Sequence, residues 1–582
     1  MIAKINNSIA VLPFRNISSD KENEYFSDGI TEEILNALTK IEGINVIARS
    51  SSFTYKNRDI DPREVGSQLG VAFILEGSVR KAGNNVRVTA QLIKTSDCFH
   101  LFSEVYNREL KDIFKVQDDI ASKIVTKFTD KLNIEGSVNK LVTSSTKNIE
   151  AYDIYLKGRY NLSKGSLDAT MTAIQYFEAS LRKDKDFVLP LAGLAACYTF
   201  LGGSGLMEAD EAFRKAKEYA ITSNQIDKGL AETHLSLAQS SFWGDWDFEN
   251  TGIYIKTAIG LSPGTSSIHG FNSLFLMATG KMEEAEIEAH LAAKLDPLSI
   301  TGKFRLGELF YRSERFIEAV EIFEEILAEN IYFKQASIFK GWCHLFLGDF
   351  EMAVSTFRNI PITSDESIIF YGGLAFAYNK KMKYDEVLKC FRDFSSEVSG
   401  GSLHWLNYNR TLMLRALGEK EKMYESLEIC LAEKNTPLIF INVDPVWNEY
   451  REDPRFIELL KNAFDQEGKD QITRIKTDTK EEFVINLRNL VYVEAQENYS
   501  KIVWTDNKTI REKLLRVTLK LIEAQVVDHV IVRCHRSYII NTNVDFTVLG
   551  NSNGYRLKSD LVEHTIPISR SIGKEIVQKL KK

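Results

Sequence analysis

Basic side chains are concentrated toward the end of this 582-residue chain. Residues 471–582 contain 19 Lys and Arg against 13 Asp and Glu, a net charge of +6, which leaves −13 for residues 1–470 because the whole chain carries −7. A guanidinium group is a planar fork that matches the two acceptors of a guanine edge, whereas an ammonium group suits single phosphate oxygens. The pattern favours a polyanionic partner for the tail, although a charge of +6 also fits an ordinary solvated surface.

Residues able to catalyse a reaction or to hold a metal are sparse and scattered. The six cysteines stand singly, with no CxxC pair and no histidine at zinc-site spacing, so we expect reduced thiols and no metal site. No GxxxxGK[ST] or GxGxxG phosphate loop is present. Asp28 and Glu32 lie four residues apart and could act as paired carboxylates on a helix, but we expect them to cap and solvate it. The sequence predicts no cofactor and no catalytic residue.

Length and composition indicate several folded domains. At about 150 residues per domain, the chain corresponds to three or four units. A hydrophobic share of 44% and a charged share of 26% are ordinary for a globular protein. No uninterrupted apolar stretch of about 18 residues occurs, and the first residues lack the basic start and long apolar run of a signal peptide. We therefore expect a cytoplasmic protein with no membrane partner.

The part from about Phe483 onward is typical of a small β-rich domain. Short apolar or alternating runs predict strands at 490–493, 501–504, 508–511, 530–532, 538–540, 546–549 and 555–557. A single helix fits 517–524, and the run Asn551-Ser-Asn-Gly554 indicates a hairpin turn. Ser569 is expected to cap a terminal helix that turns Ile572, Ile576 and Leu580 inward.

Three motifs in this part occur in an order and spacing that match a known family. They are Val491-Tyr-Val-Glu-Ala-Gln-Glu-Asn-Tyr499, Val532-Arg-Cys-His-Arg-Ser-Tyr-Ile-Ile-Asn541 and Ile566-Pro-Ile-Ser-Arg570. Together they resemble the LytTR family of DNA-binding domains across residues 471–582. The resemblance implies a β-rich module that inserts loop residues into successive major grooves of double-stranded DNA.

The same resemblance implies which residues face DNA. They lie in three segments, namely Asn498, Tyr499, Ser500 and Lys501, then His535 and Arg536, then Arg570 and Lys574. Arginine suits guanine edges, whereas Lys501, Lys508, Arg511 and Lys574 suit phosphates. Alternatives remain open, because His535 could be structural, the two arginines could form surface salt bridges, and the tyrosines could simply pack. A serine at position 500 is a weak base reader.

The middle of the chain repeats with a period of 34 residues. Small residues recur at Ala285, Ala319 and Ala353, with Val387 next, and a second series is Ser273, Gly307, Gly341 and Ala375. Such positions allow paired helices to cross closely, while large residues such as Phe323 and Phe357 fill the space beside them. The pattern resembles the tetratricopeptide repeat and predicts an all-α solenoid over 148–464. Its face is expected to bind a protein or peptide, and a spacer without a partner is the alternative.

The first 135 residues predict an α/β domain. An apolar strand over 8–14 precedes a helical stripe from Phe26 to Ile41, a second strand, and a helix opened by Asp61-Pro62 and ended at Gly70. Three late strands and a helix over 113–128 follow. The runs Ile9-Ala-Val-Leu-Pro-Phe14, Tyr25-Phe-Ser-Asp-Gly-Ile-Thr31, Ile47-Ala-Arg-Ser50 and Leu75-Glu-Gly-Ser-Val-Arg80 resemble the TolB-amino-terminal-like domain. That resemblance implies a fold but no settled chemistry.

The sequence thus predicts three domains, at 1–135, 148–464 and 471–582. We expect a sequence-specific DNA-binding transcriptional regulator that is not an enzyme, binds double-stranded DNA as a homodimer, and senses a signal or recruits a partner through its first two domains. The alternatives are a scaffold that assembles proteins through its repeats and an enzyme whose site lies in the N-terminal domain. Steep salt dependence of DNA binding would separate the regulator from the scaffold.

Overall fold

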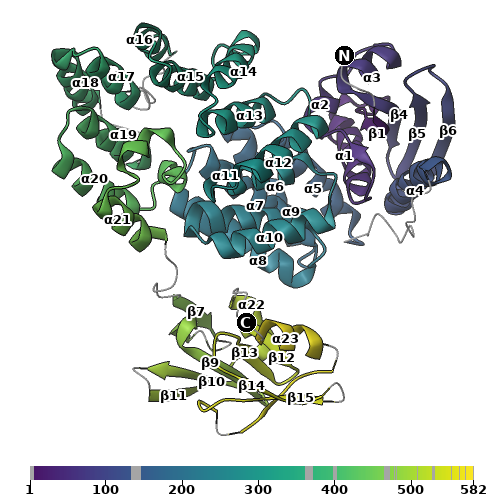
Figure 1. Ribbon diagram of the computed structural model, residues 1–582. Coiled ribbons are helices and arrows are strands. Elements are labelled where there is room, and N and C mark those ends of the chain that lie inside the picture. The colour runs from purple at the N-terminus through teal and green to yellow at the C-terminus, as the bar shows by residue number, and fades with distance from the viewer. Residues whose placement is uncertain are drawn as a thin grey trace. The chain divides into compact units, whose positions relative to one another are not determined.

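The computed structural model describes residues 5–132, 146–360, 371–397, 403–464, 472–477, 479, 481–506, 509–526, 531–551, 554–562, 564–570 and 572–580. They form two compact units, Met1–Ala463 and Phe464–Lys582 (Figure 1). The predicted limit between the first two domains falls on residues 133–145, outside the described part, and stays a prediction. Within the described part, every helix is too short or too polar to cross a membrane.

The first unit begins with a mixed sheet. Its strands are β1 (Ile5–Val11), β2 (Arg15–Asn16), β3 (Asn45–Val46), β4 (Val71–Ala82), β5 (Asn85–Lys94) and β6 (His100–Glu109). The order is β3-β1-β4-β5-β6, with β1 parallel to both neighbours and β4, β5 and β6 antiparallel, while β2 pairs with β4. The helices are α1 (Glu24–Thr39), α2 (Arg49–Phe53), α3 (Pro62–Leu69) and α4 (Ile113–Leu132). The predicted α/β fold of this part is confirmed.

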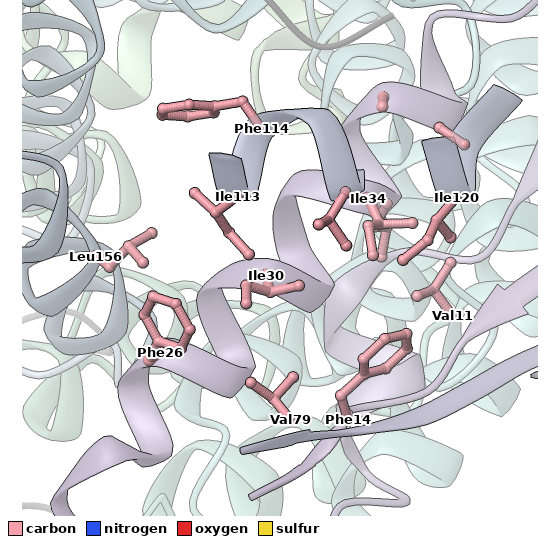
Figure 2. Close-up of a cluster of buried hydrophobic side chains, with 14 of the residues drawn as sticks. Val11, Phe14, Phe26, Ile30, Ile34, Val79, Ile113, Phe114, Ile120 and Leu156 are labelled. Carbon is pink, nitrogen blue, oxygen red and sulfur yellow. The ribbon is translucent and has the colours of Figure 1, made fainter. Parts of the chain in front are cut away.

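Local sequence explains these elements. The Asp61 carboxylate accepts a hydrogen bond from the Arg63 amide, Pro62 occupies the first turn of α3, and Gly70 ends the helix at φ 67°. Helices α1 and α4 pack one face of the sheet, and Figure 2 shows apolar side chains from both helices meeting those of the strands. The four-residue spacing of Phe26, Ile30 and Ile34 places all three in this core, with no exposed surface.

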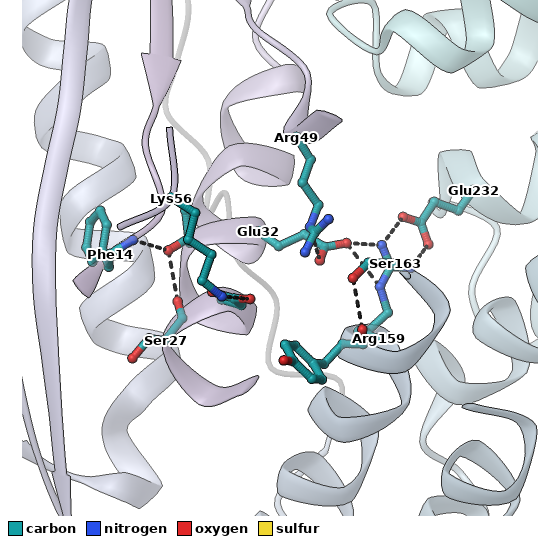
Figure 3. A network of polar contacts seen from close by, with 11 residues as sticks. Phe14, Ser27, Glu32, Arg49, Lys56, Arg159, Ser163 and Glu232 are labelled. Carbon is teal, nitrogen blue, oxygen red and sulfur yellow. Dashed lines mark hydrogen bonds and ion pairs between the residues drawn. The ribbon is translucent and has the colours of Figure 1, made fainter. Parts of the chain in front are cut away.

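Asp28 and Glu32 were expected to cap and solvate α1, and that expectation is wrong. Asp28 is 2% exposed and accepts hydrogen bonds from the Lys56 ammonium, whose nitrogen lies 2.6 Å from one carboxylate oxygen. Burial raises the pKa of Asp28, while Lys56 opposes the rise. Glu32 is 8% exposed and is held by guanidinium groups from two other helices (Figure 3). Both carboxylates therefore belong to buried ion pairs, which the spacing along one helix does not reveal.

Helix pairs make up the rest of the first unit, as the 34-residue period predicts. The helices are α5 (Ile149–Leu162), α6 (Leu167–Lys183), α7 (Val188–Gly203), α8 (Ala209–Ile226), α9 (Ala231–Ser240), α10 (Phe248–Leu261), α11 (Ser266–Ala278), α12 (Met282–Leu295), α13 (Ile300–Arg312), α14 (Phe316–Glu329), α15 (Lys334–Phe346), α16 (Phe350–Arg358), α17 (Tyr371–Lys380), α18 (Tyr384–Glu397), α19 (Leu403–Ala416), α20 (Lys420–Ala432) and α21 (Pro454–Phe464).

The small residues of the period lie where paired helices cross. Ala285, Ala319 and Ala353 have no exposed surface. A Cβ atom added at Gly307 would lie 2.5 Å from the Phe323 ring, and one at Gly341 would lie 2.7 Å from the Phe357 ring. The aromatic ring of one helix thus fills the space that glycine leaves on its partner, which is close packing of the kind that confers a unique helix crossing.

The proline-rich end of the array does more than terminate it. Two short 3-10 helices, Thr436–Phe440 and Pro445–Tyr450, follow α20. The Phe440 ring packs edge-on against Phe242, just after α9. Asp444 accepts hydrogen bonds from Tyr311 at 3.0 Å and from Arg312 at 3.2 Å at the end of α13. The chain therefore covers part of its own repeat surface.

The second unit is β-rich, as predicted. Its elements are β7 (Ile472–Lys476), β8 (Glu482–Asn486), β9 (Leu490–Gln496), β10 (Tyr499–Asp506), β11 (Thr509–Leu515), α22 (Leu519–Gln525), β12 (Ile531–His535), β13 (Tyr538–Asn541), β14 (Thr547–Asn551), β15 (Gly554–Lys558), β16 (Ile566–Pro567) and α23 (Gly573–Leu580). The main sheet has the order β11-β10-β9-β13-β12, and β14-β15-β16 and β7-β8 form two smaller sheets. The β7–β8 hairpin had no counterpart among the predicted strands.

Both faces of the main sheet are covered. One core groups Val493 and Ile502 with Ile522 of α22, and the other groups Val503 and Ile540 with Ile576 of α23. Strand β9 is consequently buried on both sides over its first four residues, which explains its continuous apolar run. A sheet held from both faces is a rigid support for the turns at its ends.

Candidate nucleic-acid interface

The first predicted segment is the turn between β9 and β10. Glu497 takes a left-handed conformation at φ 54°, which reverses the chain tightly. Asn498 is exposed at the tip, and Tyr499, the first residue of β10, is 40% exposed. Both side chains are open to a ligand from solvent.

Ser500 does not belong to this exposed set. Its side chain has no exposed surface, and its hydroxyl donates a hydrogen bond of 2.8 Å to the Val517 carbonyl oxygen. Successive residues of a strand point to opposite faces, so an exposed Tyr499 places Ser500 in the core. The expectation that Ser500 faces DNA is therefore corrected to a structural role.

Lys501 is on the sheet surface, but its ammonium group has a partner. Its nitrogen lies 2.5 Å from a Glu512 carboxylate oxygen on β11, and the side chain is 25% exposed. The contact with Glu512 raises the pKa of Lys501, so the group stays charged at neutral pH. Lys501 would have to leave Glu512 to reach a phosphate.

The second segment is the turn between β12 and β13. Arg536 is exposed, whereas His535 is half-buried and its Nδ1 accepts a hydrogen bond from the Ser537 amide at 3.3 Å. Burial lowers the pKa of His535, and the charges of Arg536 and Arg533 add to the effect. The imidazole is therefore neutral at pH 7, which fits a residue that shapes the turn.

Arg533 holds this turn from behind, and sequence reasoning missed it. Its Nη2 donates a hydrogen bond of 2.9 Å to the Arg536 carbonyl oxygen, and its Nη1 lies 2.9 Å from a Glu523 carboxylate oxygen on α22. The backbone that carries Arg536 is thus tied to a helix. An arginine between apolar residues of a strand, three residues before a turn, is the signal that could have identified it.

The third segment precedes α23. The Ser569 amide donates a hydrogen bond of 2.8 Å to the Cys534 carbonyl oxygen, which anchors this loop to β12. Arg570, the next residue, is exposed. Lys574 lies on α23, but its side chain is outside the described part of the structure.

These three segments, which are far apart in the sequence, meet at one end of the main sheet. The Ala495 amide donates to the Ser537 carbonyl oxygen at 2.9 Å, which joins the first turn to the second, and the bond from Ser569 to Cys534 adds the third. The two predicted arginines, Arg536 and Arg570, are thereby placed on rigid turns at the same end of the sheet. Loops held on such a support present their side chains with little reorganisation.

One basic residue of the predicted phosphate set lies elsewhere. Arg511 is on β11 opposite Trp504, near the end of β10 that is farther from Asn498, and its guanidinium is 3.7 Å from Asp506. Lys508, between the same two strands, is outside the described residues. The structure therefore divides the predicted cations into a group at the three turns and Arg511 at the opposite end.

Two family models match the chain. Residues 480–581 match the LytTr DNA-binding domain, and residues 5–123 match the second domain of the HilA/YgeH-like transcriptional regulators. The second description differs from the TolB-amino-terminal-like resemblance, which stays a prediction.

Known proteins also resemble parts of the chain. The Rhizobium meliloti (strain 1021) protein described as "Putative adenylate cyclase 3" is 41% identical over 188 residues, a match that spans 32% of each chain. The transcriptional regulator HilA of Salmonella typhimurium is 21% identical over 466 residues, 78% of each chain. A tetratricopeptide repeat protein from Parabacteroides merdae covers 45% of this chain and 98% of its own, at 14% identity and a TM-score of 0.33.

The matched residues 480–581 contain all three turns. They also contain the whole of the main sheet and the terminal helix that supports it. The C-terminal part of the chain therefore belongs to the LytTR family of DNA-binding domains, and it follows an α/β domain and an array of helix pairs that resembles tetratricopeptide repeats.

Proposed function

We propose that this protein is a sequence-specific DNA-binding transcriptional regulator whose base contacts come from Arg536 and Arg570. The observation that carries the proposal is that three separate segments present exposed polar side chains from one end of a sheet that is packed on both faces. The match of 78% of the chain to the regulator HilA supports the same function.

The two arginines suit the reading of guanine edges. Each is exposed and sits beside a backbone that is hydrogen-bonded to the sheet, so that the guanidinium fork is held at a defined place. Good bidentate contacts discriminate between bases by about 1–3 kcal/mol. Asn498 and Tyr499 lie on the neighbouring turn and add polar and stacking contacts to the same surface.

A selection experiment tests the proposal. Purified full-length protein is used to select duplexes from a random DNA library, and affinity for the selected site is then measured by fluorescence anisotropy. Arg536→Ala and Arg570→Ala are each expected to weaken binding about 5- to 150-fold, the equivalent of one lost bidentate contact. Non-specific binding should change much less.

Arg511→Ala is the matched control, because it also removes one exposed arginine from the same unit but at the opposite end of β10. It is expected to change specific affinity by no more than about twofold, the effect of one distant charge. Equal losses for Arg511→Ala and Arg536→Ala would contradict the proposed surface. A flat salt dependence of binding would favour a protein scaffold, because DNA contacts release counterions.

The remaining parts of the proposal concern partners. We propose that two copies bind paired DNA sites, because one set of three turns offers few base contacts and duplication multiplies specificity. Sedimentation of the protein with DNA of one or two sites tests this stoichiometry.

The first unit is proposed to receive the signal or partner. We propose no catalytic activity, because the match to the transcriptional regulator HilA spans 78% of each chain, whereas the match to the protein described as "Putative adenylate cyclase 3" spans 32%.

A further inference from the structure

A cavity of about 650 Å³ lies between the N-terminal domain and the repeats of the first unit. One wall is formed by α1 and the start of α2. The other comes mainly from α5, α7, α9, α11 and α13, the first helices of five successive pairs. Repeat arrays present such helices as a continuous binding surface. Here the N-terminal domain covers that surface.

Hydrogen bonds join the N-terminal domain to the repeats at two places beside the cavity. The Gly264 amide donates to the Thr39 carbonyl oxygen at 3.0 Å, and the Ala48 amide donates to the Leu295 carbonyl oxygen at 2.7 Å. The Ser51 hydroxyl adds a hydrogen bond of 2.5 Å to Asp296. The cavity volume falls within the range of about 300–1,000 Å³ that is typical of small-molecule sites. The space suits a compact ligand better than a folded partner.

Most charged groups of the wall are already neutralised. The Arg159 guanidinium donates to Glu32 and to Glu232, with 2.9 Å between Nη1 and the Glu232 carboxylate (Figure 3). The Arg49 Nε lies 3.2 Å from the second Glu32 oxygen, and Arg305 is paired with Glu308. An anionic ligand would have to displace a carboxylate to reach one of these guanidinium groups.

Glu33 is the exception. It follows Glu32 on α1 and lines the cavity, and among the described residues none gives its carboxylate a hydrogen bond or an ion pair. Burial raises the pKa of Glu33 to about 7; the charges of Glu32 and Glu232 add to the rise, and those of Arg159 and Lys40 oppose it. Tyr155, which lines the same cavity, has a pKa raised well above its ordinary value by burial and so carries no charge. An arriving cation would find here a carboxylate that no described side chain pairs with directly.

Apolar groups also line the cavity. Leu235 of α9 and Leu274 of α11 line the same cavity, together with the Trp243 ring. We propose that this cavity binds a small molecule in which an apolar body carries a protonated amino group, with the Glu33 carboxylate as its counter-ion. This inference does not rest on DNA binding by residues 480–581, and its test contains no DNA.

The probes are three primary amines of increasing size, namely butylamine, phenethylamine and tryptamine, with their alcohol and carboxylic acid counterparts. Binding to the full-length protein is measured by isothermal titration calorimetry. An amine stays charged up to about pH 10, whereas Glu33 gains its charge near pH 7. The best amine is therefore expected to bind about tenfold more tightly at about pH 8 than at about pH 6, and more tightly than its alcohol at the higher pH.

Glu33→Gln is expected to abolish both the preference for the amine and its pH dependence. Glu218→Gln is the matched control, because Glu218 is an exposed glutamate that is paired with Arg214 outside the cavity. It should leave amine binding unchanged. The proposal is overturned if amine and alcohol bind equally at the higher pH, if the acids bind best, or if no amine binds.

Discussion

The two units place their arginines in opposite environments. In the unit Met1–Ala463, the side chains of Arg159 and Arg312 are 15% and 5% exposed, and each is held by two carboxylates. In the unit Phe464–Lys582, Arg536 and Arg570 are exposed, and the described contacts of Arg536 are made by its backbone. The same side chain thus joins helices in one unit and is presented to solvent in the other.

The difference shows that the cost of burial separates charged side chains that hold the fold together from those that remain available to a ligand. A charge removed from water is tolerated only if ion pairs and hydrogen bonds replace the lost hydration, so a buried arginine is committed to its partners. An exposed arginine keeps its hydration until a ligand arrives. Arg533 stands between the two cases, because it is 31% exposed and uses its charge to shape the turn that presents Arg536.

Arg159→Ala is expected to have the largest effect on stability. Removal of the guanidinium leaves Glu32 buried without this partner, which lowers the free energy of unfolding of the first unit by about 3–5 kcal/mol. Denaturant unfolding followed by tryptophan fluorescence measures this, since every tryptophan except Trp504 lies in that unit. Arg214→Ala removes an arginine that is 60% exposed and should change little. Equal effects of the two variants would contradict the contrast between buried and exposed arginines.

Glu33→Gln is expected to stabilise the first unit in a pH-dependent way. The folded-state pKa of about 7 lies above the ordinary 4.5, so the folded form binds a proton more tightly than the unfolded form. That stabilisation is complete below about pH 4.5 and is lost as the pH rises through about 7. The variant should therefore match the wild type in acid and exceed it by about 1–3 kcal/mol above pH 7. Parallel stability curves for the two proteins would contradict an ionisable Glu33 with a raised pKa in the folded state.

Arg533→Ala is expected to loosen one turn of the second unit. Loss of its bonds to the Arg536 carbonyl and to Glu523 weakens the turn by about 1–2 kcal/mol, equivalent to about 5- to 30-fold faster amide exchange in residues 531–541. Hydrogen–deuterium exchange with mass spectrometry measures the change. Lys513→Ala serves as the control, because Lys513 lies on the edge strand β11 and forms an ion pair with Glu481. Unchanged exchange in 531–541 would remove Arg533 as a positioning residue.

The smallest effect on stability is expected from the double variant Arg536→Ala/Arg570→Ala. Both side chains are exposed, so their removal should change the free energy of unfolding of the second unit by no more than about 0.5 kcal/mol. Thermal unfolding monitored by circular dichroism measures this. A large destabilisation would show that these arginines are structural, and the contrast between the units would fail.

Periodic features were predictable from the sequence. The 34-residue spacing of small residues predicted the helix pairs, because a close crossing needs glycine or alanine at the same point of every repeat. The strands of the second unit were predicted from local apolar runs, but the β7–β8 hairpin was not, since Ile472–Lys476 has only two apolar residues, three positions apart, and so forms neither an apolar run nor a regular alternation. The roles of Asp28 and Ser500 were missed because their partners, Lys56 and Val517, lie 28 and 17 residues away.

Local order along the chain therefore determined which helices, strands and turns form, since apolar periodicity and capping residues act over a few neighbouring positions. Long-range packing alone decided which turns meet at one end of the sheet, that Glu32 faces Arg159, and that a cavity remains under the N-terminal domain. Burial and charge pairing depend on residues brought together from distant parts of the sequence, and they set the pKa of Glu33 and the exposure of Arg536.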